Sequence, residues 1–140
     1  MKNIILLFLL IYIPAISQDS TEIIHPIEAE MKICLDLDSN YSTQAMLDCV
    51  YIATDSWKLE LNKNYNELIS KLDDDKKNYL KKSHQYWLVY KENEFKLINE
   101  IYLSKVGTMY ILMAALDKLK LIKSRALELK EYIDIMNIDE

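Results

Sequence analysis

The chain of 140 residues is poor in the residue types that shape tight turns and most catalytic motifs. It contains one glycine, two prolines, two cysteines and two histidines. So little glycine and proline leaves little material for tight hairpins, and there is no glycine-rich loop of the kind that cradles phosphate. Lys, Leu, Ile, Glu, Asp, Asn and Tyr dominate instead. The composition therefore favours an all-helical protein.

Residues 1–17 have the order of a secretory signal peptide. A short segment containing Lys2 precedes an apolar run over 4–13, and residues 14–17 supply a small-x-small cleavage signal that ends at Ser17. The apolar run is shorter than the roughly 20 residues that span a bilayer. No cysteine lies near the cut, so a lipoprotein is not indicated. We expect cleavage after Ser17 and a mature domain over 18–140 that has no membrane span and is periplasmic or secreted.

The mature domain is acidic. The whole chain has 17 Lys and Arg against 22 Asp and Glu, and loss of Lys2 with the leader leaves 16 against 22, a net charge of −6 with both histidines neutral. Such a charge argues against non-specific binding to nucleic acid or to anionic membrane. It suits a basic protein partner, although many soluble proteins carry a similar charge.

The two cysteines, Cys34 and Cys49, are expected to form a disulfide. An even cysteine count in an exported protein is read as a disulfide first. The closed loop of about 15 residues would stabilise the fold by roughly 3 kcal/mol. Free thiols or half of a metal site are the alternatives. A metal site needs about four ligands, and His25 and His84 have no ligand-like spacing with the cysteines.

Apolar residues recur at steps of three and four, which is the period of an amphipathic helix. The pattern predicts a short helix over 26–37 that starts at Pro26, long helices over about 43–72 and 75–104, and a further long helix after Gly107. The expected helix caps are Ser42 or Thr43, the run Asp73, Asp74 and Asp75, and Thr108. Short connections make consecutive helices antiparallel. We therefore predict an all-α antiparallel bundle of three long helices, with the short N-terminal helix clipped to it by Cys34–Cys49.

The sequence shows no catalytic constellation. Ser83 and His84 are neighbours on a helix, so their side chains diverge by about 100° and cannot form a nucleophile–base pair. We expect His84 to pack near Trp87 or to accept a hydrogen bond at the edge of the bundle, and His25 has no visible partner. The acids at 73–75 lack the alternating ligands and the glycine of a calcium loop, so capping explains them better. We expect neither an enzyme nor a bound metal or cofactor.

Polar residues border the expected core stripes near the middle of the long helices. Trp57 and Trp87 lie on the stripes and are expected in the core. The bordering polar residues are Asn62, Gln85, Lys91 and Glu92. Because buried polar groups must be paired, we expect these four to form a network that fixes the register of two helices. A binding role for them is the alternative.

These residues, in their order and spacing, resemble the LprI-like family, which is named for a lysozyme inhibitor. The resemblance is carried by Cys34, Met46-x-x-Cys49, Trp57-x-x-x-Leu61-Asn62-x-x-Tyr65-x-x-Leu68, Leu80 and Gln85-x-Trp87-x-x-Tyr90-Lys91-Glu92. The chain departs from the family in having Lys58 where Asp is frequent, Lys91-Glu92 where Arg-Asp is frequent, and no cysteine near Phe95. The missing cysteine leaves Cys34–Cys49 as the sole pair. Lysine does not reproduce the bidentate geometry of arginine, so a looser polar network is implied.

The resemblance implies an exported bacterial binding protein that inhibits lysozyme-type muramidases outside the cytoplasm. An acidic domain complements such enzymes, which are often basic. Charge and exposure, not a family motif, suggest Asp36 and Asp38 as contacts, since a disulfide-clamped turn loses less freedom on binding. The second candidate is the turn of Asp73, Asp74 and Asp75. The alternative function is a structural, adaptor or immunity-type protein of the bacterial cell envelope.

Overall fold

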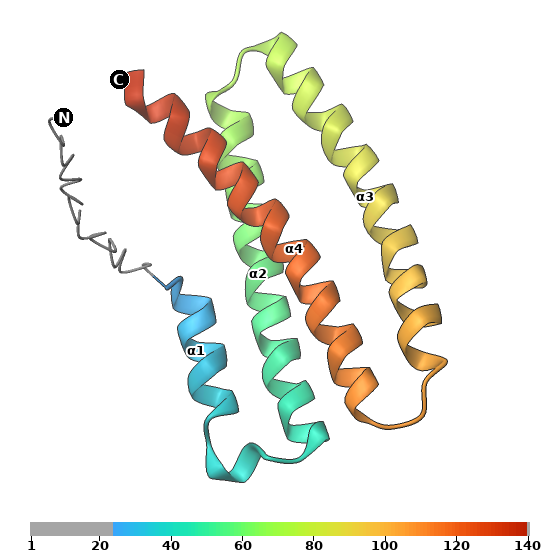
Figure 1. Ribbon diagram of the computed structural model, residues 1–140. Helices are drawn as coiled ribbons and strands as arrows, with labels where there is room; N and C mark the ends of the chain where they lie inside the picture. The colour runs from blue at the N-terminus through green and yellow to red at the C-terminus, as the bar shows by residue number, and fades with distance from the viewer. Residues whose placement is uncertain (1–23, 140) are drawn as a thin grey trace, which may run out of the picture.

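The computed structural model describes residues 24–139 and consists of four α-helices and two short 3-10 turns (Figure 1). The elements are α1 Pro26–Leu35, η1 Asp38–Asn40, α2 Thr43–Lys71, α3 Asp74–Leu103, α4 Met109–Met136 and η2 Asn137–Asp139. The all-α prediction, with three long helices and a short N-terminal helix held by a disulfide, is confirmed. The predicted signal peptide and the first residues of the mature domain lie outside the described residues.

The N-termini of the helices are capped largely by the residues that the sequence predicts. Pro26 is the first residue of α1, and Ser42 and Asp73 are the N-caps of α2 and α3. The Ser42 hydroxyl accepts the backbone N–H of Ala45 at 3.2 Å. One expectation was wrong, because His25 does have a partner. Its Nδ1 accepts the N–H two residues on, at 3.3 Å, and caps α1.

The end of α1 and the start of α4 differ from the prediction. Helix α1 stops at Leu35, two residues earlier than expected, where Asn40 Nδ2 donates to the carbonyl of Cys34 at 2.8 Å and satisfies a helix-end acceptor. Thr108 makes no side-chain capping bond, and its hydroxyl lies 3.2 Å from that of Thr43. Gly107 before it has a φ of +121°, which an L side chain rarely adopts.

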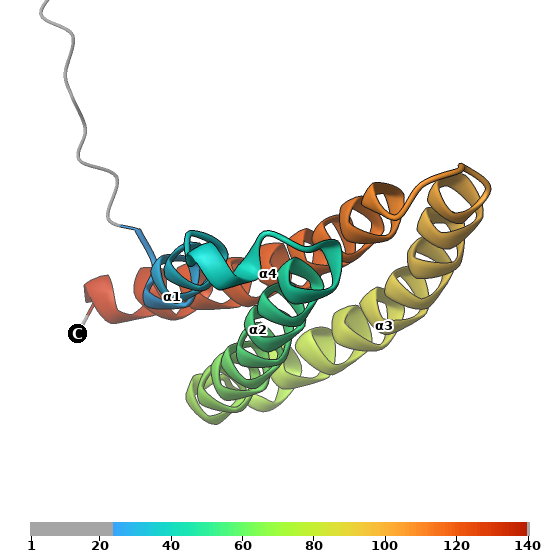
Figure 2. The same ribbon diagram turned by 90° about the horizontal axis from the view of Figure 1, so that it is seen from below.

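The core lies mainly between α2 and α4, which pack along their length, while α1 and α3 flank this pair on opposite sides (Figures 1 and 2). The fully buried apolar residues are Val50, Trp57, Ala126, Leu129 and Ile133. Helix α3 buries only Leu80 and Ile98. The three long helices therefore contribute unequally to the core, and α3 contributes least.

Two polar side chains are buried within the described chain, Asn64 and Arg125. Asn64 Nδ2 donates to the carbonyl of Ala126 at 3.0 Å and so joins α2 to α4 inside the core. A buried amide with a partner of this kind fixes the relative position of two helices. This is the role that sequence reasoning assigned to other residues.

Candidate functional site

A disulfide joins the end of α1 to the first turns of α2. The sulfurs of Cys34 and Cys49 are bonded, with 5.8 Å between the two Cα atoms, which confirms the predicted pairing. The side-chain amide of Asn40 lies 3.7 and 3.6 Å from the two sulfurs and fixes η1 beside them. We call residues 26–55, which comprise α1, η1 and the first half of α2, the N-terminal layer.

The N-terminal layer is also held to the central helix pair by a partly buried contact that sequence reasoning missed. Trp57 on α2 is fully buried, and its Nε1 donates to Glu28 Oε1 of α1 at 3.0 Å. The other oxygen of Glu28 pairs with Lys123 Nζ of α4 at 2.8 Å. The ring of His25 lies 4.4 Å from that of Trp57, between centroids. One carboxylate thus ties three helices together.

Negative charge is concentrated in the N-terminal layer. Residues 26–55 carry six carboxylates and a single basic residue, whereas residues 56–138 carry 12 carboxylates and 15 Lys and Arg. The six acids are Glu28, Glu30, Asp36, Asp38, Asp48 and Asp55. The rest of the described chain is therefore slightly basic, and the acidity of the protein belongs to one end and one edge of the molecule.

Most of these carboxylates face solvent. Glu30, Asp36, Asp38 and Asp48 are all exposed. Asp36 pairs with Lys32 at 2.6 Å, but both side chains are more than half exposed, and such surface pairs hold little energy. No lysine or arginine among residues 24–139 comes within ion-pair distance of Glu30, Asp38 or Asp48. Glu28 and Asp55 pair with Lys123 and Lys58, which lie outside the layer. Three of the six carboxylates, Glu30, Asp38 and Asp48, therefore have no lysine or arginine partner among the described residues and can meet a basic surface.

The acidic turn before α3, the second candidate contact, is electrically balanced instead. Asp73 caps α3 and pairs with Lys76 at 2.6 Å, and the hydrogen bond from Lys76 lowers the pKa of the Asp73 carboxyl. Asp74 lies 3.8 Å from Lys77. Asp75 is exposed in the first turn of the helix. Since lysines accompany two of the three acids, this turn presents little net charge to a partner.

The polar network expected of Asn62, Gln85, Lys91 and Glu92 does not form. Asn62, Gln85 and Glu92 are exposed, and Lys91 pairs at 3.2 Å with the adjacent Glu92, which cannot set the register of two helices. Successive helical residues are rotated by about 100°. A residue next to a core position, such as Asn62 after Leu61, is thereby turned out of the core.

The remaining residues that carry the family resemblance are buried to different degrees, and some of them line a cleft. Trp57 is buried in the core as expected, and so is Leu61, but the same expectation was wrong for Trp87, which is only half-buried at the edge of the core. Tyr65 is half-buried and Tyr90 is exposed. Leu61, Asn62, Trp87 and Lys91 line one cleft of about 220 Å³ between α2 and α3, together with Lys58, His84, Leu88, Phe95 and Ile122. The structure therefore does bring Asn62 and Lys91 together, at the wall of a cleft and not inside a core.

His84 lines this cleft and packs near Trp87, one of the two arrangements expected, and it also lies against Tyr65. Its ring centroid is 4.5 Å from that of Tyr65 and 5.6 Å from that of Trp87. Burial lowers the pKa of His84, and the positive charges of Arg125 and Lys91 lower it further. The cleft is thus neutral at its base and cationic at its rim, which suits a basic partner less well than the N-terminal layer does.

Neither a metal centre nor a membrane helix is found in the described part of the chain. No three His, Cys, Asp or Glu side chains converge there in the way a bound metal ion requires. None of its helices combines the length and the apolar character needed to cross a bilayer.

Comparison with known proteins gives a matching family model and a similar solved structure. The model of the family described as "Lysozyme inhibitor LprI" matches residues 28–129. A crystal structure of an uncharacterized protein from Burkholderia thailandensis is similar over 79% of this chain, with a TM-score of 0.75 and 28% sequence identity. The similar part is 54% of that protein, so this chain spans about half of its length. No curated protein matches the chain.

Proposed function

The chain belongs to the LprI lysozyme-inhibitor family, and from this premise we propose that it is an exported binding protein that inhibits a lysozyme-type muramidase through its N-terminal layer. In this proposal the protein acts by occupying a surface of the enzyme and catalyses no reaction itself. The disulfide and the family are consistent with a location outside the cytoplasm, where lysozymes act.

The segregation of charge is the observation that carries the choice of surface. The N-terminal layer holds six carboxylates and one lysine, and the rest of the described chain has more bases than acids. A basic enzyme is therefore attracted to the layer and oriented by it, since complementary potentials steer the encounter and disfavour other orientations. The balanced turn at 73–75 lacks this property and becomes the weaker of the two candidates.

Rigidity supports the same surface. The disulfide, the amide of Asn40 and the contact of Glu28 with Trp57 and Lys123 all hold the layer in place before any partner arrives. A surface that is already ordered loses less conformational entropy on binding. Asp36 and Asp38 lie between the two cysteines, in the part of the layer that the disulfide closes.

Enzyme inhibition tests the proposal directly. The oxidised protein from Gln18 onward is titrated into lysozymes of several types while peptidoglycan hydrolysis is measured at low and at high salt. We expect stoichiometric inhibition of at least one type. We expect it to weaken at high salt, because exposed charges are screened beyond about 8–10 Å at 0.10–0.15 M ionic strength. A matched sample of the reduced protein, with both thiols blocked, should inhibit less.

Two results would contradict the proposal. Inhibition that does not change with salt would exclude the acidic layer as the main contact. No inhibition of any lysozyme type would exclude the inhibitor function for this chain and would favour the adaptor role in the cell envelope, which a search for a bound envelope partner would then address.

A further inference from the structure

A second, larger groove lies at the other end of the molecule, between the first turns of α3 and the last turns of α2 and α4. Its volume is about 580 Å³, within the range of about 300–1,000 Å³ that is usual for small-molecule sites. Its walls are largely apolar and include Leu72, Leu80, Ile135 and Met136. We call it the Arg125 groove, after the one buried charged residue that lines it.

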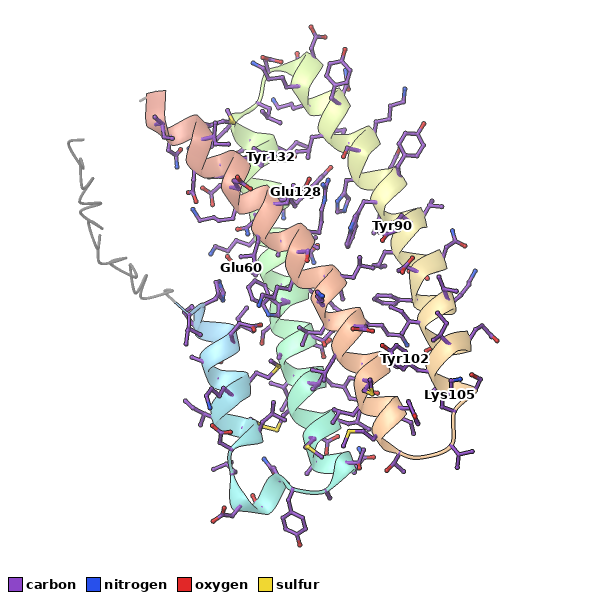
Figure 3. The ribbon with its side chains drawn as sticks, in the orientation of Figure 1. Glu60, Tyr90, Tyr102, Lys105, Glu128 and Tyr132 are labelled. Carbon is purple, nitrogen blue, oxygen red and sulfur yellow. A yellow bond between two sulfur atoms is a disulfide. The ribbon has the colours of Figure 1, made fainter. Side chains whose placement is uncertain are left out.

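Arg125 is only 6% exposed, and its hydrogen bonds are incomplete. Nη1 donates to Glu128 Oε2 at 2.7 Å, and Nη2 donates to the hydroxyl of Ser83 at 3.3 Å. Nε is buried and has no acceptor among the described residues. Glu128 is itself held by the hydroxyl of Tyr132 at 3.0 Å, on the stretch of α4 that Figure 3 labels.

The donors that remain lie on one edge of the guanidinium. Nε and the outer nitrogen, Nη2, point their N–H groups in parallel, and this edge is the fork that a carboxylate accepts with both oxygens. Here one donor of the fork has no partner and the other makes a long bond to Ser83, which also lines the groove. An unpaired buried donor costs free energy, so an anion at this edge would be favoured.

We propose that the Arg125 groove binds a single-chain amphiphile with a carboxylate head, of the fatty-acid class. The carboxylate takes the Nε and Nη2 donors of Arg125 in place of the Ser83 hydroxyl, and the hydrocarbon chain lies along the apolar walls. Lys76 also lines the groove, with its ammonium paired to Asp73 at 2.6 Å. This site is remote from the N-terminal layer and does not depend on lysozyme binding.

The chemistry of the groove favours this ligand over its competitors. A neutral chain would leave Nε unpaired. An extended peptide would bring backbone polar groups that the apolar walls cannot satisfy. A phosphate monoester carries more charge and more acceptor oxygens than the two remaining donors of Arg125 can pair.

Isothermal titration calorimetry with palmitate, below the concentration at which it aggregates, tests the proposal on the full mature protein. We expect one molecule bound per chain. We expect hexadecanol, which has the chain alone, and butyrate, which has the carboxylate and little chain, each to bind at least about tenfold more weakly. Equal binding of palmitate and hexadecanol would overturn the role of Arg125. Tighter binding of hexadecyl phosphate would overturn the choice of a carboxylate.

Variants separate the head site from the walls. Arg125→Lys keeps the charge and loses the fork, and it should weaken palmitate binding about tenfold. Arg125 is buried, so its replacement can also disturb the core. A second variant avoids this problem: Tyr79→Glu, at a groove residue that is 75% exposed, places a repelling carboxylate at the rim. The matched control is Tyr86→Glu, two turns further along α3, 67% exposed and outside the groove.

We expect Tyr79→Glu to weaken palmitate binding about tenfold and Tyr86→Glu to change it less than about twofold. Equal affinities of these two variants would place palmitate somewhere other than the groove and would overturn the proposal. Circular dichroism of each variant confirms that the helices are retained, so that a loss of binding reports on the site.

Discussion

Replacing Cys34 and Cys49 together by serine removes the covalent link between α1 and α2, and the size of the effect can be worked out. The disulfide closes a loop with a sequence separation of 15. In the loop-entropy model, a loop of this length stabilises the native state by about 3 kcal/mol. The entropy of unfolding is ~2.1 cal/mol/K per residue, or ~0.24 kcal/mol/K over residues 24–139, so the melting temperature should fall by ~12 °C.

The fold itself should survive this change. Helices α2 and α4 form most of the core without the disulfide, and Glu28 still joins α1 to Trp57 and Lys123. We therefore expect full helical signal by circular dichroism at 25 °C, together with a lower urea midpoint and a slightly larger slope, because the unfolded chain is less compact without the link. Reduction of the native protein with dithiothreitol is the matched control and should give the same shift.

The reasoning would be refuted by either extreme. A loss of less than about 1 kcal/mol would show that closure of this loop does not restrict the unfolded chain as the entropy model requires. A variant that is unfolded at 25 °C would show that the α2–α4 core contributes less stability than its burial indicates.

Three further changes test the buried contacts. Acidification from pH 7 to pH 5 should lower the free energy of unfolding, because burial and two neighbouring cations lower the pKa of His84 in the folded state. Below the usual histidine pKa of about 6.5, the folded state then binds fewer protons than the unfolded state. His84→Gln should flatten this pH dependence in urea titrations. Trp57→Phe leaves Glu28 without its indole donor and should cost ~2 kcal/mol in chemical denaturation, and a cost below ~0.5 kcal/mol would argue against the contact. Asn64→Asp sets a carboxylate against the carbonyl of Ala126 and should cost ~2 kcal/mol or more at pH 7 but less at pH 4, where the acid can donate; equal losses at both pH values would contradict this account.

The sequence predicted the helices well because local chemistry determines them. Steps of three and four in apolar residues marked all four, and Pro26, Ser42 and Asp73 start their helices as expected. The disulfide followed from the cysteine count and the expected compartment. The divergence of α3 was not predicted, because periodicity shows which face of a helix is apolar and not how deeply that face is buried.

The site residues were harder to predict, since they depend on contacts between distant parts of the chain. The contact of Glu28 with Trp57 and Lys123 joins three helices, and no spacing in the sequence marks it. Arg125 carried no signal for the same reason. Asn62 was misplaced because proximity to a core position along the chain was taken as proximity in space. The concentration of acids at one end could be counted in the sequence, but only the packing of α1 beside α2 makes it one surface.

The central claim is that the acidic N-terminal layer binds lysozyme, and charge reversal at two places tests it most directly. The inhibition constant is measured at low salt for Asp36→Lys/Asp38→Lys and for the matched control Asp74→Lys/Asp75→Lys, with a lysozyme type that the native protein inhibits. The account predicts that the first variant raises the inhibition constant at least about tenfold and that the control changes it less than about threefold. Equal effects, or a larger effect of the control, would contradict it.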